Sequence, residues 1–311
     1  MTLLPYDEFG LFHENAAEYG LAIEPPVIVR RVSLPVAPSR VASALVWGSS
    51  DPELVFVHGG AQNAHTWDTV ALALGVPLVA VDLAGHGHSG WRDDGVYSPS
   101  NLADDLAIVV AALAPHARVV VGMSLGGLTS MVLAARYPEL VRRLVMVDVT
   151  PGVNQNKAKA VIDFINGPQT FASFDELLAR TMEHNPTRAE SSLRRGILHN
   201  AHQDADGSWS WNYDRRSHAR SRDADAIADP ETDGSAEAPL FSPLWDDFSA
   251  VACPTTLVRG SLSPVVDDDD VAEATRRQPS LQVEVVEGAG HSIQGDRPLE
   301  LAAIIREVSR S

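Results

Sequence analysis

Cysteine is almost absent from this 311-residue sequence, which contains only Cys253. A single cysteine cannot form an intrachain disulfide, and it excludes a metal site built from several thiolates. The sequence also lacks any apolar run approaching the roughly 18 residues that a membrane-spanning helix needs. Its first residues lack a positively charged start followed by an apolar stretch. We therefore expect a cytoplasmic protein with neither a membrane-spanning helix nor a secretory leader.

Basic residues are also scarce, with 24 Lys and Arg against 41 Asp and Glu and a formal net charge of -17. This balance disfavours polyanionic partners, so we expect no nucleic-acid partner and no acidic membrane partner. With 45% hydrophobic residues in a chain of this length, one large α/β domain with an insertion fits better than two separate domains. We expect a monomer or a homodimer.

Apolar runs spaced along the chain predict the fold class. They alternate with helix-like segments, which is typical of a parallel sheet covered by helices. We predict a mostly parallel eight-stranded sheet flanked by helices, formed by residues 1–151 and 246–311, with an antiparallel hairpin at one edge. The expected strands cover residues 27–34, 43–47, 54–57, 78–82, 119–121, 144–149, 255–260 and 282–286.

Residues 152–245 interrupt this alternation and are predicted to form a mainly helical cap. They contain helix-like segments, at 157–165, 174–183 and 189–198, but no run suited to a central strand. Trp209, Trp211 and Tyr213 in this insertion alternate with a period of two. They either form one wall of an apolar substrate pocket or belong to a β-hairpin edge packed on the cap helices. Residues 1–26 form either a short packed helix or a partly ordered arm, and we assign them no function.

The strongest signal for chemistry is Gly122-Met123-Ser124-Leu125-Gly126. A run of three valines precedes this Gly-x-Ser-x-Gly pattern, and a helix-like segment follows it over residues 128–136. A strand, a sharp turn with a serine at its apex and a helix together form a nucleophile elbow. Side chains at Gly122 and Gly126 would collide with the neighbouring strand and helix, which explains the two glycines.

Two further glycine-containing loops follow predicted strands. His58, Gly59 and Gly60 follow the strand at 54–57, and their backbone N–H groups suit the first donor of an oxyanion hole. His86 and His88 invite a metal hypothesis, but no nearby side chain completes a ligand set, so we interpret them as parts of a tight turn. The sequence has no nucleotide-binding glycine pattern, and we expect neither a cofactor nor a metal.

These motifs and a late Gly288-Ala289-Gly290-His291 occur in the order typical of the α/β-hydrolase superfamily. The chain resembles this family over residues 27–151 and 250–309. The resemblance implies an α/β-hydrolase fold with Ser124 as the nucleophile and His291 as the general base and then the general acid.

The resemblance also implies the two donors of the oxyanion hole. The backbone N–H of Leu125, the residue after the nucleophile, is one donor. Gly60 supplies the other, and Ala61 remains an alternative to Gly60. We expect His58 to brace this loop. His65, His199 and His202 are expected to be structural or surface residues, with lining of the pocket as the alternative.

The third triad residue departs from the family's common pattern. Ser263 stands where an Asp usually follows the strand at 255–259, and a serine cannot carry the charge that stabilises an imidazolium. Asp148 is the replacement that we favour. Asp267 is a possible alternative acid, although it opens an acidic run suited to capping a helix. A Ser–His dyad supported by Ser263 or by water is the third possibility.

The favoured function is a serine hydrolase that cleaves a small-molecule carboxylic ester, lactone or related acyl substrate through an acyl-enzyme. A serine nucleophile argues against halide and epoxide chemistry, which would use an aspartate. Hydrolysis of a carbon–carbon bond on the same triad is an alternative. A non-catalytic ligand receptor that kept the fold is another, because the usual acid is missing.

Overall fold

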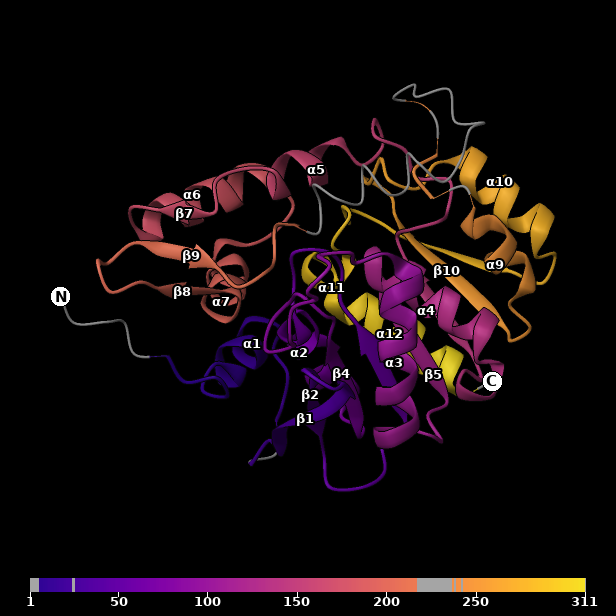
Figure 1. Ribbon diagram of the computed structural model, residues 1–311, viewed down its shortest axis with the longest axis horizontal. Helices are drawn as coiled ribbons and strands as arrows, with labels where there is room; N and C mark the ends of the chain where they lie inside the picture. The colour runs from indigo at the N-terminus through magenta and orange to yellow at the C-terminus, as the bar shows by residue number, and fades with distance from the viewer. Residues whose placement is uncertain (1–5, 24–25, 217–236, 238, 242, 311) are drawn as a thin grey trace.

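The computed structural model describes residues 6–23, 26–216, 237, 239–241 and 243–310. An eight-stranded sheet forms its centre, in the order β1-β2-β4-β3-β5-β6-β10-β11 (Figure 1). Strand β2 is antiparallel to both of its neighbours, and the other neighbouring strands are parallel. The strands are β1 Val29–Ala37, β2 Arg40–Trp47, β3 Leu54–Val57, β4 Leu78–Asp82, β5 Val119–Met123, β6 Leu144–Val147, β10 Thr255–Gly260 and β11 Gln282–Val286. The predicted fold class and edge hairpin are therefore confirmed.

Helices cover both faces of this sheet, and every residue of β3, β4, β5 and β6 is buried. A parallel sheet covered on both faces needs apolar side chains in both directions, which explains the continuous apolar runs of these strands. The core helices and 3₁₀ helices are η1 Ala64–Trp67, α2 Asp68–Leu74, α3 Pro99–Leu113, α4 Leu125–Arg136, η2 Pro138–Leu140, α9 Leu244–Ala250, α10 Asp268–Arg277, α11 Ile293–Asp296 and α12 Pro298–Arg310.

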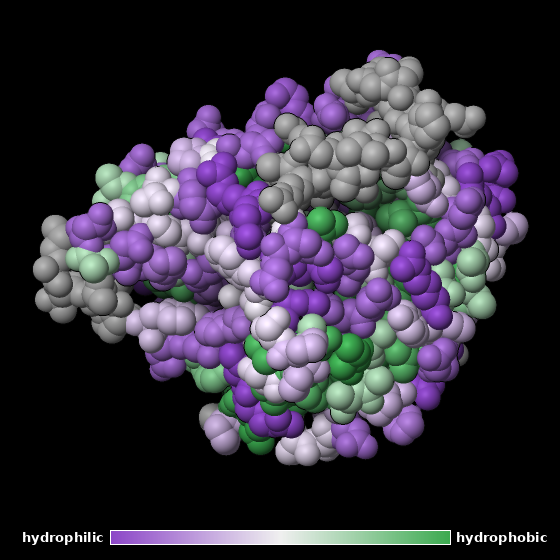
Figure 2. Space-filling model, in the orientation of Figure 1, coloured by the Kyte–Doolittle hydropathy of each residue, from purple (hydrophilic) through white to green (hydrophobic). Residues whose placement is uncertain are grey.

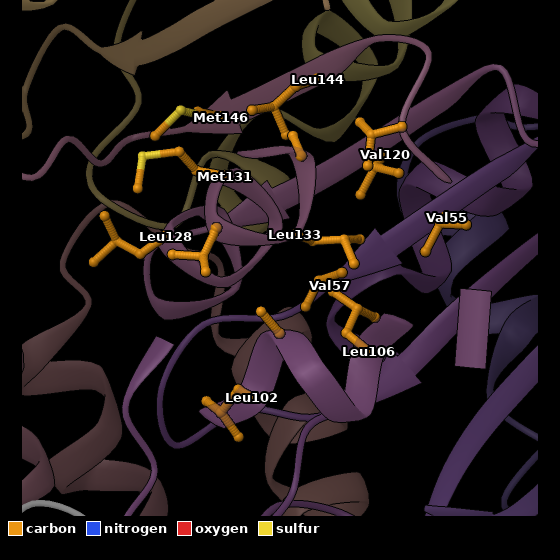
Figure 3. Close-up of a cluster of buried hydrophobic side chains, with 14 of the residues drawn as sticks. Val55, Val57, Leu102, Leu106, Val120, Leu128, Met131, Leu133, Leu144 and Met146 are labelled. Carbon is orange, nitrogen blue, oxygen red and sulfur yellow. The ribbon is translucent and has the colours of Figure 1, made fainter. Parts of the chain in front are cut away.

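The hydrophobic core has two layers, one on each face of the sheet. Figure 3 shows part of the first layer, where Leu102 and Leu106 of α3 and Leu128 and Met131 of α4 lie with side chains of the central strands. The second layer is formed by α2, α12 and the N-terminal helix α1 (Phe12–Glu18), in which Phe12 packs against the strand residue Trp47. Of the two alternatives for residues 1–26, the packed helix is therefore correct for the α1 segment.

The insertion combines helices with a small sheet. It comprises α5 Lys159–Ile165, β7 Thr170–Phe171, α6 Phe174–His184, α7 Glu190–Asn200, β8 Ala201–Gln203 and β9 Trp209–Trp211. The three strands pair antiparallel in the order β7-β9-β8. Figure 1 shows this sheet with α6 and α7 to one side of the large sheet, near α1 and α2. The three helices agree with the predicted segments, and the period-two alternation around Trp209 belongs to a strand. Residues 217–236 of the predicted cap lie outside the described residues.

None of the described helices is both long enough and apolar enough to cross a bilayer. Figure 2 shows hydrophilic residues over much of one face of the molecule, with apolar residues gathered mainly in its lower half.

Candidate active site

Ser124 lies at the turn between β5 and α4, with φ at 51° and ψ at -121°. Such a positive φ is unusual for a residue with a side chain and marks a strained turn. A Cβ at Gly122 would overlap the carbonyl of Gly126, and a Cβ at Gly126 would overlap the carbonyl of Val57 on β3. The two glycines of the motif are therefore required by close backbone packing, as the sequence predicts.

The structure brings three of the predicted site residues into one hydrogen-bonded chain. The Nε2 atom of His291 lies 3.1 Å from Ser124 Oγ, and its Nδ1 atom lies 2.7 Å from Asp148 Oδ2. Ser124 follows β5, Asp148 follows β6 and His291 follows β11, so all three lie at the carboxyl edge of the sheet. A carboxylate at Nδ1 selects the tautomer in which Nε2 can accept the serine proton.

Asp148 is fixed from several directions. Its side chain is completely buried, and its φ of 53° marks a sharp turn directly after β6. Oδ1 accepts a hydrogen bond from the Gly260 N–H at 3.0 Å, and Oδ2 accepts one from the Ser263 hydroxyl at 2.5 Å. Ser263, at the position of the family's usual acid, thus donates to a carboxylate that comes from the neighbouring strand.

Asp267, the alternative acid, has a different environment. It is the N-cap residue of α10 and forms a capping box with Asp270. Its Oδ2 atom lies 2.9 Å from Lys157 Nζ. Since Nδ1 of His291 faces Asp148 instead, the structure does not bring Asp267 to the site. Its geometry is that of a helix cap, and the hypothesis that it is the triad acid is not supported.

The loop after β3 lies against Ser124, because a Cβ on Gly59 would be only 3.2 Å from the Cβ of Ser124. The Ala61 N–H donates to Nε2 of His86 at 3.0 Å and is therefore not free to bind an oxyanion. The Gly60 N–H has no acceptor among residues 6–23, 26–216 and 243–310. Leu125 opens α4, where an N–H has no acceptor within its own helix. Gly60 and Leu125 are therefore the available donors.

Two buried histidines hold this loop in place. His58 accepts a hydrogen bond from the Leu83 N–H at Nε2 and donates from Nδ1 to the Gly59 carbonyl. Burial lowers the pKa of His58, so it is held neutral. His58 braces the loop as predicted. The contact of His86 with Ala61 was not predicted, because the tight-turn pattern says nothing about which backbone N–H faces the ring.

Comparison with known proteins identifies the family. A family model described as alpha/beta hydrolase fold matches residues 52–298. The chain belongs to the α/β-hydrolase family.

Individual relatives of this α/β hydrolase agree over nearly its whole length. It is 45% identical over 309 residues to esterase Rv0045c of Mycobacterium tuberculosis, a match that covers 97% of this chain and 95% of the relative. A refined structure of that esterase, reported together with its transition metal inhibition, superposes with a TM-score of 0.82 at 44% identity and covers 99% of this chain and 100% of that chain. The structure of E-2-(acetamidomethylene)succinate hydrolase is more distant, with a TM-score of 0.77 at 26% identity over 92% of this chain and 100% of that chain.

The α/β hydrolase has a cavity of about 110 Å³ between the insertion and the core. His65, His199 and Trp211 are among its lining residues, whereas Ser124 and His291 are not. His202 is exposed and bonds to Asn212. His65 and His199 thus line this cavity and His202 does not. Because neither Ser124 nor His291 lines it, the alternative that these histidines line the substrate pocket stays a prediction.

The two tryptophans predicted for the pocket serve mainly as core residues of the insertion. Trp209 packs edge-to-face against Phe174, and Trp211 packs against Phe164 and Phe171. Both indoles are buried. The prediction of a pocket wall is not supported for Trp209, because its side chain packs into the hydrophobic core of the insertion. Trp211 lines the cavity but is itself a buried, packed side chain.

Proposed function

We propose that this protein is a serine ester hydrolase acting on small-molecule esters, with Ser124, His291 and Asp148 as its triad. The observation that carries the proposal is the unbroken chain of hydrogen bonds from Ser124 Oγ through His291 to Asp148. The 45% identity to a protein named esterase supports the same reaction class. Belonging to the α/β-hydrolase family supports it further.

In this mechanism, His291 Nε2 removes the proton of Ser124 Oγ while the oxygen attacks the ester carbonyl. The resulting oxyanion is bound by the N–H groups of Gly60 and Leu125, each worth on the order of 3 kcal/mol in the transition state. His291 then protonates the leaving alcohol, and an acyl-enzyme remains on Ser124. A water molecule, deprotonated by His291, releases the acid and restores the serine. Asp148 accepts the hydrogen bond from His291 Nδ1 and stabilises the imidazolium.

The hypothesis of a non-catalytic receptor depended on the missing usual acid. The carboxylate of Asp148, at hydrogen-bonding distance from His291, removes that basis. No described residue favours carbon–carbon bond hydrolysis over ester hydrolysis. Lactones belong to the proposed substrate class, because the same attack on a carbonyl opens them. The cytoplasmic location, the division into core and cap, and the monomeric or homodimeric state remain predictions.

The test is a panel of p-nitrophenyl esters and lactones assayed with the wild type and three variants. Ser124→Ala is expected to lose nearly all activity, and Asp148→Asn to lower kcat by about 10³- to 10⁴-fold through the wrong imidazole tautomer. Asp267→Asn is the matched control and should stay within about twofold of wild type. Full activity in Asp148→Asn with a collapse in Asp267→Asn would reverse the assignment of the acid. A folded wild type that forms no fluorophosphonate adduct on Ser124 would refute the hydrolase itself.

A further inference from the structure

Outside the triad, three titratable side chains form one buried cluster between the core and the insertion. His65 lies on η1, Asp68 opens α2, and His199 lies in the last turn of α7. Each of the three side chains is only 3% exposed. Asp68 Oδ2 lies 2.9 Å from His65 Nδ1 and 3.7 Å from His199 Nε2. Two ring nitrogens from different parts of the fold thus face the same carboxylate.

Two atoms of this cluster have no hydrogen-bond partner in the part of the chain that the structure describes. They are Asp68 Oδ1 and His199 Nε2. Burying an acceptor without a partner is costly, so such atoms usually mark the binding of a water, ion or ligand. Both residues line the cavity of about 110 Å³, which is large enough for an ion with water on it. The cluster therefore combines unpaired polar atoms with space beside them.

The outer nitrogens of both rings are already held. His65 Nε2 lies 3.2 Å from Glu8 Oε1, and His199 Nδ1 lies 2.7 Å from the hydroxyl of Tyr6. Histidines that ligate metals have this arrangement, in which the second ring nitrogen binds a carboxylate or another oxygen and fixes the ring. It leaves His65 Nδ1 and His199 Nε2 directed toward Asp68.

We propose that His65, Asp68 and His199 bind a divalent transition-metal ion, for which Zn²⁺ is the best suited. Two imidazoles and one carboxylate form a ligand set that zinc commonly accepts, with water in the fourth position. The three ligand atoms lie within 4.8 Å of one another. A tetrahedral zinc site brings them to about 3.3 Å. The two rings are stacked with centroids 3.8 Å apart and planes at 6°. Binding would bring His199 Nε2 and Asp68 Oδ2, which are 3.7 Å apart, slightly closer together.

This site would connect two parts of the fold. His65 and Asp68 belong to the core, whereas His199 belongs to the insertion, so the ion would link the two directly. A ligand that binds only the folded protein raises its melting temperature. The inference goes beyond ester hydrolysis, because none of the three residues belongs to the proposed triad, and either proposal can fail alone.

The first experiment measures Zn²⁺ binding by calorimetry with the full chain after treatment with a chelator. We expect one equivalent to bind with a dissociation constant on the order of a micromolar or tighter. A hundredfold excess of Zn²⁺ over that constant should raise the melting temperature by several degrees. His199→Gln and Asp68→Asn should each abolish this binding, and Glu8→Gln should weaken it about tenfold. The absence of a tight equivalent in the wild type would mean that the cluster holds water only.

Two matched variants separate this site from other histidines. His202→Gln removes an exposed histidine paired with Asp204, and it should leave the tight site intact. If His291→Gln abolishes binding while His199→Gln and Asp68→Asn retain it, the ion binds at the triad and the proposal is wrong. X-ray absorption at the zinc edge counts the imidazole ligands in the wild type, so it does not depend on the folding of any variant. Two imidazole ligands support the cluster, whereas one imidazole would contradict it.

Discussion

At the scale of single residues, the most informative position is Ser263. It stands where the family usually has its acid, and its hydroxyl donates to Asp148 at 2.5 Å. The acid of the proposed triad thus comes from the end of β6 instead of the loop after β10, and the residue at the usual position donates a hydrogen bond to it. Ser263 is therefore expected to be a positioning residue that acts through Asp148.

Replacing this hydroxyl tests the role. Ser263→Ala removes one of the hydrogen bonds to the Asp148 carboxylate but leaves the bond from the Gly260 N–H. A hydrogen bond to a charged group contributes about 1.5–3 kcal/mol, so we expect kcat for ester hydrolysis to fall roughly tenfold or more, with little change in KM. Ser263→Thr keeps a hydroxyl and should restore most of the rate. Equal losses in both variants would indicate a packing role instead.

At the scale of elements, the turn from β5 into α4 depends on the close approach of three backbones. The carbonyls of Val57 and His58 lie where a Cβ of Gly126 would be. The turn therefore ties β3, β5 and α4 together, and the same approach brings the loop with Gly60 to Ser124. Stability and the proposed oxyanion hole depend on the same glycine.

Adding one methyl group at two different glycines tests this point. Gly126→Ala should lower the free energy of unfolding by about 1–3 kcal/mol or more, because the backbone must shift. Gly196→Ala on α7 is the matched control, since its Cβ would meet no atom within 4 Å. It should raise stability by about 0.5–1 kcal/mol through helix propensity. Chemical denaturation of both variants gives the two values, and a neutral Gly126→Ala would contradict the packing argument.

At the scale of the whole molecule, an ion-pair network attaches the N-terminal segment to the sheet. Arg31 on β1 contacts both Glu8 and Asp82, and the Asp82 side chain is completely buried. Burial raises the pKa of Glu8, but hydrogen bonds from His65 and Arg31 outweigh it and lower the pKa to about 2. Burial likewise raises the pKa of Asp82. The charge of Arg31 outweighs this effect of burial, so the pKa of Asp82 is also lowered.

These shifts predict how stability depends on pH. A carboxylate whose pKa is lowered by folding stabilises the protein above its unfolded pKa, and this contribution is lost as the pH falls toward the folded pKa. For Glu8 the loss should occur between about pH 4.5 and pH 2. Glu8→Gln should therefore lower the melting temperature at pH 6 and reduce its dependence on pH in that window. Glu284→Gln, at an exposed position of β11, should leave the dependence unchanged.

Much of this architecture follows from local patterns in the sequence. The apolar runs predict the strands of the sheet, since a strand buried on both faces is made almost entirely of apolar residues. The Gly-x-Ser-x-Gly turn between a strand and a helix predicts the place of Ser124, because only glycine permits that backbone packing. These features depend on neighbours in the chain, so the sequence by itself determined them.

Only the tertiary structure decided which distant side chains meet. Asp148 and His291 are 143 positions apart in the sequence, yet their side chains are in contact. The local pattern allowed a carboxylate at either 148 or 267, and in the folded protein Asp267 contacts Lys157. The fold also placed His199 of the insertion against His65 and Asp68 of the core. No local pattern encodes such a contact, because its distance depends on the packing of whole elements and not on the residues between them.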